Sequence, residues 1–163
     1  ECSPRIIQVL ISKPDSSALD QLNRIYQDIM FHSEEEIDRV AENIKKFLNG
    51  EDFTFSLDMV ALERCSPFQE AVLCAEYQIP RGSVSTYGLL ANHIGNPKGA
   101  RAVGNALARN PFPIIIPCHR AIRSDGYIGG FQGGVGMKKA LLEKEGVKIT
   151  DDGRVITEHF YYE

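Results

Sequence analysis

The segment Ile114-Ile115-Ile116-Pro117-Cys118-His119-Arg120 leads from an apolar, β-branched run straight to a cysteine that is followed by a histidine and an arginine. The β-branched residues predict a buried strand over 114–116, which Pro117 would end. Only the thiolate of a cysteine is a strong nucleophile, and neighbouring cations or a general base supply it at neutral pH. The segment therefore predicts a reactive Cys118, although such a triplet alone is more often a buried structural cysteine beside a charged surface pair.

Length and composition describe an ordinary globular chain. Its 163 residues are 43% hydrophobic and 25% charged, enough to form a core in one or two small domains. No apolar run approaches the roughly 20 residues that span a bilayer, and the first five residues lack the character of a signal peptide. We therefore expect an intracellular protein, cytoplasmic or nuclear, that does not bind membranes.

The cysteines predict neither a disulfide framework nor a metal site. They stand at positions 2, 65, 74 and 118, with no Cys-x-x-Cys pair and no histidine at zinc spacing. We expect no metal and no cofactor.

The net charge of −4 divides unevenly along the chain. Residues 1–76 carry 7 Lys+Arg against 15 Asp+Glu, whereas residues 77–148 carry 10 against 3, a balance of +7. Contacts to phosphate dominate non-specific affinity for nucleic acids. The second half is therefore the expected docking face for a polyanion, and chance clustering of solvated charges is the alternative.

The first 60 residues show strand and helix patterns. Apolar residues predict a strand over 5–12, a helix over 19–30 and an alternating strand over 53–57. Ser33 and Glu36 form a capping-box pattern for a second helix, which Asn49-Gly50 would end. We place a domain boundary near residue 60.

The remainder, residues 61–163, is mainly helical. Caps at Ser66 and Ser85 predict two helices, and a third runs from Lys98 to about Arg109, where Asn110-Pro111 stops it. Two short helices joined by the turn at 95–97 suggest a helix-turn-helix with the second as recognition helix. A tight turn at 125–126, a mobile glycine-rich loop over 129–134, a last helix over 137–145 and a hairpin over 147–156 complete the prediction.

A series of motifs in this second segment occurs in a fixed order and spacing. They are Ser66-Pro67-Phe68-Gln69, Ile79-Pro80-Arg81-Gly82, Ser85-Thr86-Tyr87-Gly88, Gly95-Asn96-Pro97-Lys98-Gly99-Ala100-Arg101-Ala102-Val103-Gly104, Asn110-Pro111 and Pro117-Cys118-His119-Arg120. The segment 66–146, about half of the chain, thereby resembles the O6-alkylguanine-DNA alkyltransferases, also called methylated-DNA-protein-cysteine methyltransferases.

The resemblance implies an α/β (α+β) protein. It implies a small ribonuclease-H-like α/β domain over 1–60, and a mostly helical domain over 61–163 with a winged-helix-like helix-turn-helix. It further implies a monomer that repairs DNA by direct reversal. Such a protein extrudes O6-alkylguanine, chiefly O6-methylguanine and also O4-methylthymine, from double-stranded DNA and moves the alkyl group irreversibly to Cys118 in a single turnover.

The resemblance also assigns the catalytic roles. In the family, a glutamate orients a histidine, which removes the thiol proton through a water, and the thiolate attacks the alkyl carbon. Glu145, His119 and Cys118 match these residues. Tyr87 matches the tyrosine that hydrogen-bonds the extruded base, and Asn110 matches the asparagine that links the recognition helix to the active-site strand. A core tyrosine and a helix terminator are the simpler readings of these two.

The recognition helix is rich in small residues, so its backbone could approach DNA closely. By resemblance it enters the minor groove, where Arg101 fills the gap left by the extruded base; a phosphate contact is the alternative role. The other expected DNA contacts are Lys98, Ala100, Ala102, Gly104, Tyr87 and Arg120. The expected substrate pocket is Gly129, Gly130, Phe131 and Gln132. Phe131 and Gln132 depart from the tyrosine and small residue common in relatives, which bears on the alkyl groups accepted.

Two rival functions remain. The first is a lesion sensor of the alkyltransferase-like type, which binds damage without repairing it, but such proteins characteristically lack the acceptor cysteine. The second is a cysteine hydrolase that uses Cys118, His119 and Glu145, which would turn over repeatedly and would not need a helix of small residues carrying Arg101.

Overall fold

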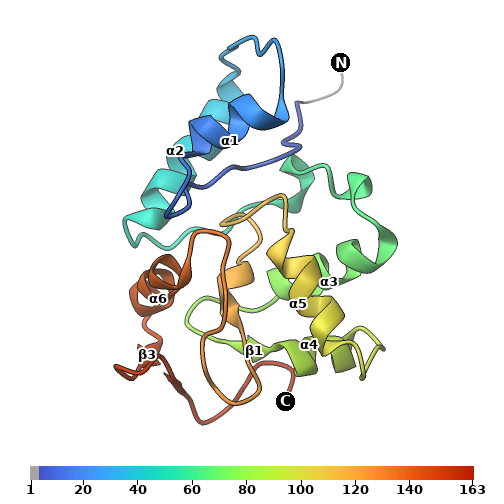
Figure 1. The fold of residues 1–163 in the computed structure, drawn as a ribbon, viewed down its shortest axis with the longest axis vertical. Coiled ribbons are helices and arrows are strands. Elements are labelled where there is room, and N and C mark those ends of the chain that lie inside the picture. Colours follow the sequence, from blue (N-terminus) through green and yellow to red (C-terminus); the bar gives the residue numbers. More distant parts are fainter. Residues whose placement is uncertain (1–3) are drawn as a thin grey trace.

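The computed structural model describes residues 4–163 and has the mixed α+β character that was expected (Figure 1). Residues 1–3, and with them Cys2, lie outside the described residues. The helices are α1 (Ala18–Ile25), α2 (Glu35–Leu48), α3 (Pro67–Tyr77), α4 (Tyr87–His93), α5 (Ala100–Ala108) and α6 (Val135–Lys144), with short 3₁₀ helices η1 (Leu57–Met59), η2 (Leu62–Arg64) and η3 (Cys118–Arg120). The strands are β1 (Ser85–Thr86), β2 (Ala121–Ile122), β3 (Lys148–Ile149) and β4 (Val155–Ile156).

Two pairs of short strands organise the second half of the chain. β1 pairs with β2 in parallel, with Ser85 opposite Ala121, and β3 with β4 forms the predicted antiparallel hairpin. η3 leads directly into β2 and β1 leads directly into α4, so the parallel pair joins the segment with Cys118 to the segment that begins α4.

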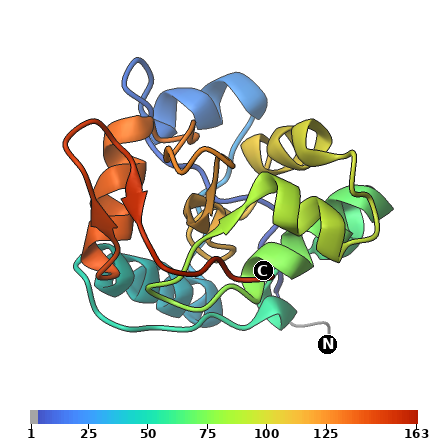
Figure 2. The ribbon, with the colours of Figure 1, turned by 90° about the horizontal axis from the view of Figure 1, so that it is seen from below.

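Figures 1 and 2 show how the elements surround this pair. Helices α3, α4 and α5 lie on one side, α6 and the hairpin lie on the other, and α1 and α2 lie at the end nearer the N-terminus. The C-terminal residues return towards α3: the backbone N–H of Tyr161 donates to Val84 O at 2.9 Å, and the Tyr162 hydroxyl donates to Ala75 O at 2.9 Å. The strand pair therefore lies between helices α3–α5 on one side and α6 with the hairpin on the other.

The strands predicted over 5–12 and 53–57 do not form, so these predictions were wrong. Among residues 4–60 the extended chain makes one parallel bridge, between Ile6 and Val60. The backbone N–H of Val9 donates instead to Pro111 O at 2.8 Å, and the apolar side chains pack on the main core. The apolar side chains of this segment are thus buried without a ladder of strands, and the ribonuclease-H-like character of residues 1–60 stays a prediction.

Several helix starts differ from the prediction by one or two residues. Ser17 caps α1 in a capping box with Asp20, and this helix ends at Ile25 rather than at residue 30. Glu34 rather than Ser33 precedes α2, and Thr86 rather than Ser85 caps α4. The Ser85 hydroxyl is used elsewhere, because it donates to Tyr161 O at 2.6 Å.

Other predicted boundaries are confirmed. The Ser66 side chain caps α3 and Gly146 ends α6 with a positive φ of 88°. Helix α5 ends close to the predicted Arg109, which is its C-cap, but it begins at Ala100, two residues after the predicted Lys98, with Gly99 as its N-cap.

The apolar run before Cys118 is a buried tight turn and not the predicted strand. Ile114 has a φ of +75°, and Pro113 bridges to Ile116 within the turn. The Asn110 side chain holds the turn closed: its Nδ2 donates to Ile116 O at 3.0 Å, and its Oδ1 accepts from the Phe112 backbone N–H at 2.9 Å. An asparagine side chain thus supplies the hydrogen bonds that a neighbouring strand would have made.

The main apolar core is continuous across residue 60. Phe47 and Phe55 belong to the same buried cluster as Leu73 of α3 and Ile116 of the tight turn. A smaller cluster under the hairpin contains Val84, Ile122 and Leu142. The domain boundary near residue 60 therefore stays a prediction.

Replacing Asn110 tests how much the turn depends on it. Asn110→Ala leaves the buried Phe112 N–H unpaired, whereas Ile116 O keeps the hydrogen bond from the Cys118 N–H, so we expect the free energy of unfolding to fall by roughly 1–3 kcal/mol. Urea denaturation measures this, with Asn23→Ala on the exposed face of α1 as control. An equal effect of the two substitutions would contradict this role of Asn110.

Candidate active site

A cavity of about 570 Å³ opens above the thiol of Cys118, which is itself only 5% exposed. One wall is formed by α5 and the first residue of α4, and another by the loop that follows β2. Its lining includes eight of the predicted site residues: Tyr87, Ala100, Arg101, Gly104, Cys118, Gly130, Phe131 and Gln132. The structure thus brings the predicted nucleophile, most of the recognition helix and most of the predicted pocket to one cavity.

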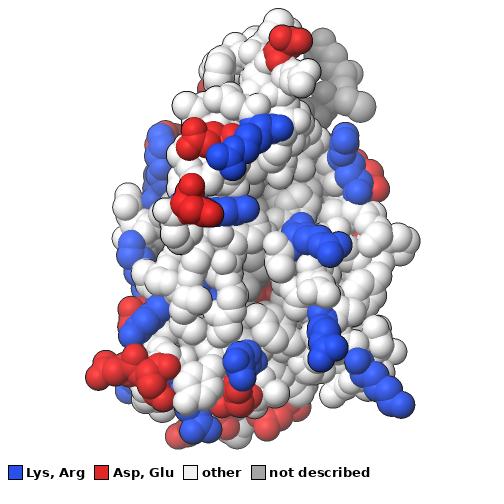
Figure 3. All heavy atoms as spheres, in the orientation of Figure 1, with Lys and Arg blue, Asp and Glu red and all other residues white. Residues whose placement is uncertain are grey.

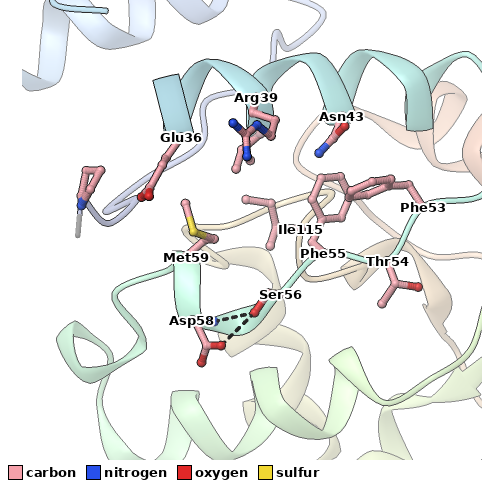
Figure 4. A pocket seen from close by; sticks show the side chains of 12 residues that line it. Glu36, Arg39, Asn43, Phe53, Thr54, Phe55, Ser56, Asp58, Met59 and Ile115 are labelled. Atoms are coloured by element: carbon pink, nitrogen blue, oxygen red, sulfur yellow. Dashed lines mark hydrogen bonds between the residues drawn. The ribbon is translucent and has the colours of Figure 1, made fainter. Parts of the chain in front are cut away.

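A second cavity of about 490 Å³ contains none of the predicted site residues. Figure 4 shows it between α2, which contributes Arg39 and Asn43, and the segment with Phe53 and Phe55, with Ile115 between them. It holds no cysteine, and we assign the chemistry to the first cavity.

Burial keeps Cys118 protonated in the resting protein. It raises the pKa of the thiol to about 12; Glu76 adds to this rise, while Asn110 and Lys138 oppose it. A thiol of this kind becomes a nucleophile only when a base removes its proton.

His119, the residue after Cys118, belongs to a buried network of hydrogen bonds. His119 Nε2 lies 2.9 Å from Glu145 Oε1, and the Arg120 guanidinium donates to both Glu145 oxygens, from Nε at 2.9 Å and from Nη2 at 2.8 Å. Arg120 Nη1 also donates to Ile79 O at 2.6 Å. This pairing places a positive charge beside the histidine and its carboxylate.

The network fixes the ionisation states of its members. Burial alone would raise the pKa of Glu145, but the hydrogen bonds and charges of His119 and Arg120 lower it to about 2, so the group is a carboxylate at neutral pH. Burial lowers the pKa of His119, so the imidazole is neutral there. Since a carboxylate only accepts, Nε2 carries the ring proton and Nδ1 keeps its lone pair. Nδ1 is buried without a hydrogen-bond partner among residues 4–163 and is the available base.

Arg120 is therefore placed differently from what was expected. It was predicted among the DNA contacts, but it is buried and its guanidinium is fully engaged with Glu145 and Ile79. The structure therefore places Arg120 in the buried network around Glu145 and not on the exposed surface.

Two buried ionisable residues that affect the pKa of Cys118 were not among the predicted site residues. Glu76 of α3 and Lys138 of α6 are both completely buried. Lys138 Nζ donates to Ala121 O at 2.6 Å and to Gly130 O at 3.2 Å, and it lies 5.8 Å from the centre of the Tyr87 ring. Both side-chain oxygens of Glu76 lack hydrogen-bond partners among the described residues.

Burial brings the pKa values of this pair together. It raises the pKa of Glu76 to about 8 and lowers that of Lys138 to about 8, with the charge of each group opposing the shift of the other. Helical spacing could have revealed them: Glu76 follows Val72 and Leu73 by four and three residues, and Lys138 precedes Leu141 and Leu142 by three and four. Both therefore lie on the apolar face of their helix.

Tyr87 and the pocket loop close the cavity around the thiol. Burial raises the pKa of Tyr87 to about 12, so its phenol remains a hydrogen-bond donor. A Cβ on Gly129 would lie 3.2 Å from the Tyr87 hydroxyl, which explains why this loop needs glycine there. Gln132 Nε2 donates to Asn110 O at 2.8 Å, and the Phe131 ring meets the His119 ring edge-on at 6.3 Å between centroids. The loop thus contacts both the turn and the base.

The outer surface of α5 is open to solvent. Arg101 and Ala102 are exposed on it, and Lys98 is exposed in the turn before it. Figure 3 shows Lys and Arg side chains on the same face of the molecule, over α5 and over the N-terminal segment. None of the helices formed by residues 4–163 is both long and apolar enough to cross a bilayer.

Comparison with known proteins identifies the family of the chain. Residues 67–147 match the family described as 6-O-methylguanine DNA methyltransferase, DNA binding domain. A methylated-DNA–protein-cysteine methyltransferase of Methanothermobacter thermautotrophicus is 46% identical over 69% of this chain and 63% of its own length. One from Haemophilus influenzae is 39% identical over 76% of this chain and 70% of its own length.

Solved structures give the same result. The O6-methylguanine-DNA methyltransferase of Pyrococcus kodakaraensis has a TM-score of 0.61 at 37% identity, covering 77% of this chain and 72% of that one. A Mycobacterium tuberculosis OGT in complex with DNA has a TM-score of 0.60 at 39% identity, covering 66% of this chain and 64% of that one. The chain belongs to the methylated-DNA–protein-cysteine methyltransferase family.

Proposed function

We propose that this protein repairs DNA by direct reversal, moving an alkyl group from O6 of guanine in double-stranded DNA to Cys118. The observation that carries the proposal is the position of the Cys118 thiol, below a cavity that α5 lines and beside a histidine whose carboxylate partner is fixed. The cavity, about 570 Å³, has the size of sites that enclose small ligands. An extruded nucleobase is such a ligand.

The transfer follows from the protonation states of the site. His119 Nδ1 accepts the thiol proton through a water, Cys118 Sγ attacks the alkyl carbon, and the bond from that carbon to O6 breaks. The electron pair of that bond stays on the guanine, where the phenol of Tyr87 can donate a proton to the leaving base. The Glu145 carboxylate stabilises the imidazolium that forms. The thioether product is not reversed, so each molecule reacts once.

We propose that α5 presents the lesion to this site from the minor groove. Its residues Ala100, Ala102 and Gly104 leave the helix backbone close to DNA, Lys98 contacts phosphate, and Arg101 occupies the space left by the extruded base. Recognition through this groove suits a lesion that occurs in any sequence, since the minor groove carries little sequence information.

The pocket loop would set the range of alkyl groups. Gly129, Gly130, Phe131 and Gln132 face the extruded base, and we propose O6-methylguanine as the main substrate and O4-methylthymine as a further one. All the proposed catalytic groups come from one chain, so a monomer is sufficient. With DNA as substrate, the proposed place of action is the cytoplasm or the nucleus.

Replacement of the nucleophile is the decisive test. Cys118→Ala should abolish methyl transfer from a duplex with one O6-methylguanine while binding to that duplex is retained. Peptide mass spectrometry of the unaltered protein should find one methyl per molecule, on the Cys118 peptide. Cys65→Ala and Cys74→Ala are controls that should react normally.

The rival functions give other results in the same experiment. Tight binding of the lesion without any methylated peptide would indicate a sensor. Multiple turnovers in the absence of DNA would indicate a hydrolase. Full transfer by Cys118→Ala would place the nucleophile elsewhere.

Replacing Arg101 distinguishes extrusion of the base from duplex DNA from the alkyl-transfer reaction itself. Arg101→Ala should slow transfer from a lesion in duplex DNA by about tenfold or more, corresponding to about 1.4 kcal/mol, because the vacated stack is no longer filled. Reaction with free O6-benzylguanine should be nearly unchanged. Arg109→Ala, at the C-cap of the same helix and outside the cavity lining, is the matched control. Equal losses on both substrates would refute the wedge role.

Glu145→Gln tests the buried network. The amide no longer fixes the tautomer of His119 and leaves Arg120 without its counter-charge, so transfer should slow by about 10²–10⁴-fold on both substrates. In the unaltered protein, Glu145 stays ionised down to its pKa of about 2, and the pKa of His119 is lowered from 6.5. The rate should therefore hold as the pH falls through 6.5, measured with free O6-benzylguanine. Glu143→Gln, on the exposed side of α6, is the control. A rate unaffected by Glu145→Gln would exclude this base.

A further inference from the structure

Part of the wall of the cavity above Cys118 comes from the N-terminal segment, outside the helix-turn-helix. Lys13 lines the cavity together with Arg101 and Cys118, although it is far from both in sequence. It lies in a tight turn in which its N–H donates to Ser16 O at 2.8 Å and its own carbonyl accepts from Ser16 N–H at 3.3 Å. The backbone of Lys13 is therefore held in a defined shape.

The turn is also packed against the loop that closes the cavity. A Cβ on Gly133 would lie 3.3 Å from Ile11 Cδ1, and one on Gly134 would lie 3.1 Å from Pro14 Cγ. On its other side, Ile11 O accepts from Gln21 Nε2 of α1 at 2.9 Å. Contacts on both flanks thus fix the position of Lys13 at the cavity.

The charge of Lys13 is available for a ligand. Its side chain is exposed, and it forms no ion pair with any carboxylate in the part of the chain that the structure describes. Two acidic residues lie nearby in sequence. Asp15 forms no ion pair with Lys13, and Asp20 accepts a hydrogen bond from Ser17 Oγ at 2.7 Å. On the α5 side, Arg101 lines the same cavity.

From this geometry we propose that Lys13 binds a backbone phosphate of the DNA strand that carries the extruded nucleotide. The inference rests on the proposed function, and it adds the N-terminal segment to the DNA-binding surface. A nucleotide whose base enters the cavity must keep its phosphodiester groups near the mouth, where a cation on the wall opposite the helix can meet them. DNA is then held from two sides, by α5 and by the 13–16 turn.

The expected contact is to phosphate and not to a base. A lysine ammonium is a compact charge on a flexible stem, suited to a phosphate oxygen without a demand for planar geometry. Such contacts position the protein on the duplex and carry no sequence information. This fits a site that must accept a lesion in any sequence.

The salt dependence of binding tests the proposal. Fluorescence anisotropy with a duplex bearing one O6-methylguanine is measured across a range of KCl concentrations, in the Cys118→Ala background so that no transfer occurs. Lys13→Gln should weaken binding several-fold at about 0.1 M salt and reduce the slope of log affinity against log salt by about 1, because one phosphate contact is lost. Lys13→Arg should keep both values.

Two controls separate this contact from other effects. Lys46→Gln removes an exposed cation from α2, outside the cavity lining, and should leave the slope unchanged. With Cys118 intact, Lys13→Gln should react with free O6-benzylguanine at the normal rate. An unchanged slope, or an equal loss with the free base, would overturn the proposal.

Failure of the proposed function would look different. In that case the protein with Cys118 intact would transfer no alkyl group from duplex or free base. The salt slope of duplex binding would still decide whether Lys13 contacts phosphate, because it is measured without the reaction.

Discussion

The carboxylate of Glu145 is the interaction on which the rest of the site depends. It lies at the C-terminus of α6 and joins that helix to η3 through His119 and Arg120. Without it, a buried guanidinium would stand unpaired and the imidazole could adopt either tautomer. One carboxylate therefore links α6 to η3 and also determines which histidine nitrogen is basic.

Signals that act over a few residues were reliable in the sequence. Asn-Pro pairs, a capping serine and a stop glycine placed α3, α5 and α6 within two residues, because caps act locally. Strands were not predictable in this way. The β-branched run over 114–116 and the apolar run over 5–12 have strand composition, but pairing requires a partner elsewhere in the chain. Asn110 instead forms hydrogen bonds to the 112–116 turn, and the apolar side chains of 5–12 pack on the main core. A single sequence does not reveal either contact.

The site shows the same difference between contacts of neighbouring residues and contacts between distant ones. Cys118, His119 and Arg120 are adjacent in sequence, so their proximity is predictable, whereas the pairing of Glu145 with them came only from resemblance to a family. Arg120 was expected among the DNA contacts, but it is buried and pairs with a carboxylate 25 residues away in sequence. Glu76 and Lys138 were missed because charged residues in helices usually face solvent.

The protonated state of the Cys118 thiol has a consequence for the working life of the molecule. A protein that reacts only once, as proposed for this one, is inactivated by any other electrophile that reaches its sulfur first. With the pKa raised to about 12 by burial, very little thiolate exists while the protein is unoccupied. Small oxidants and alkylating agents react mainly with thiolates, so they react slowly with this protonated thiol. The same burial that makes the nucleophile depend on a base also preserves it until a lesion arrives.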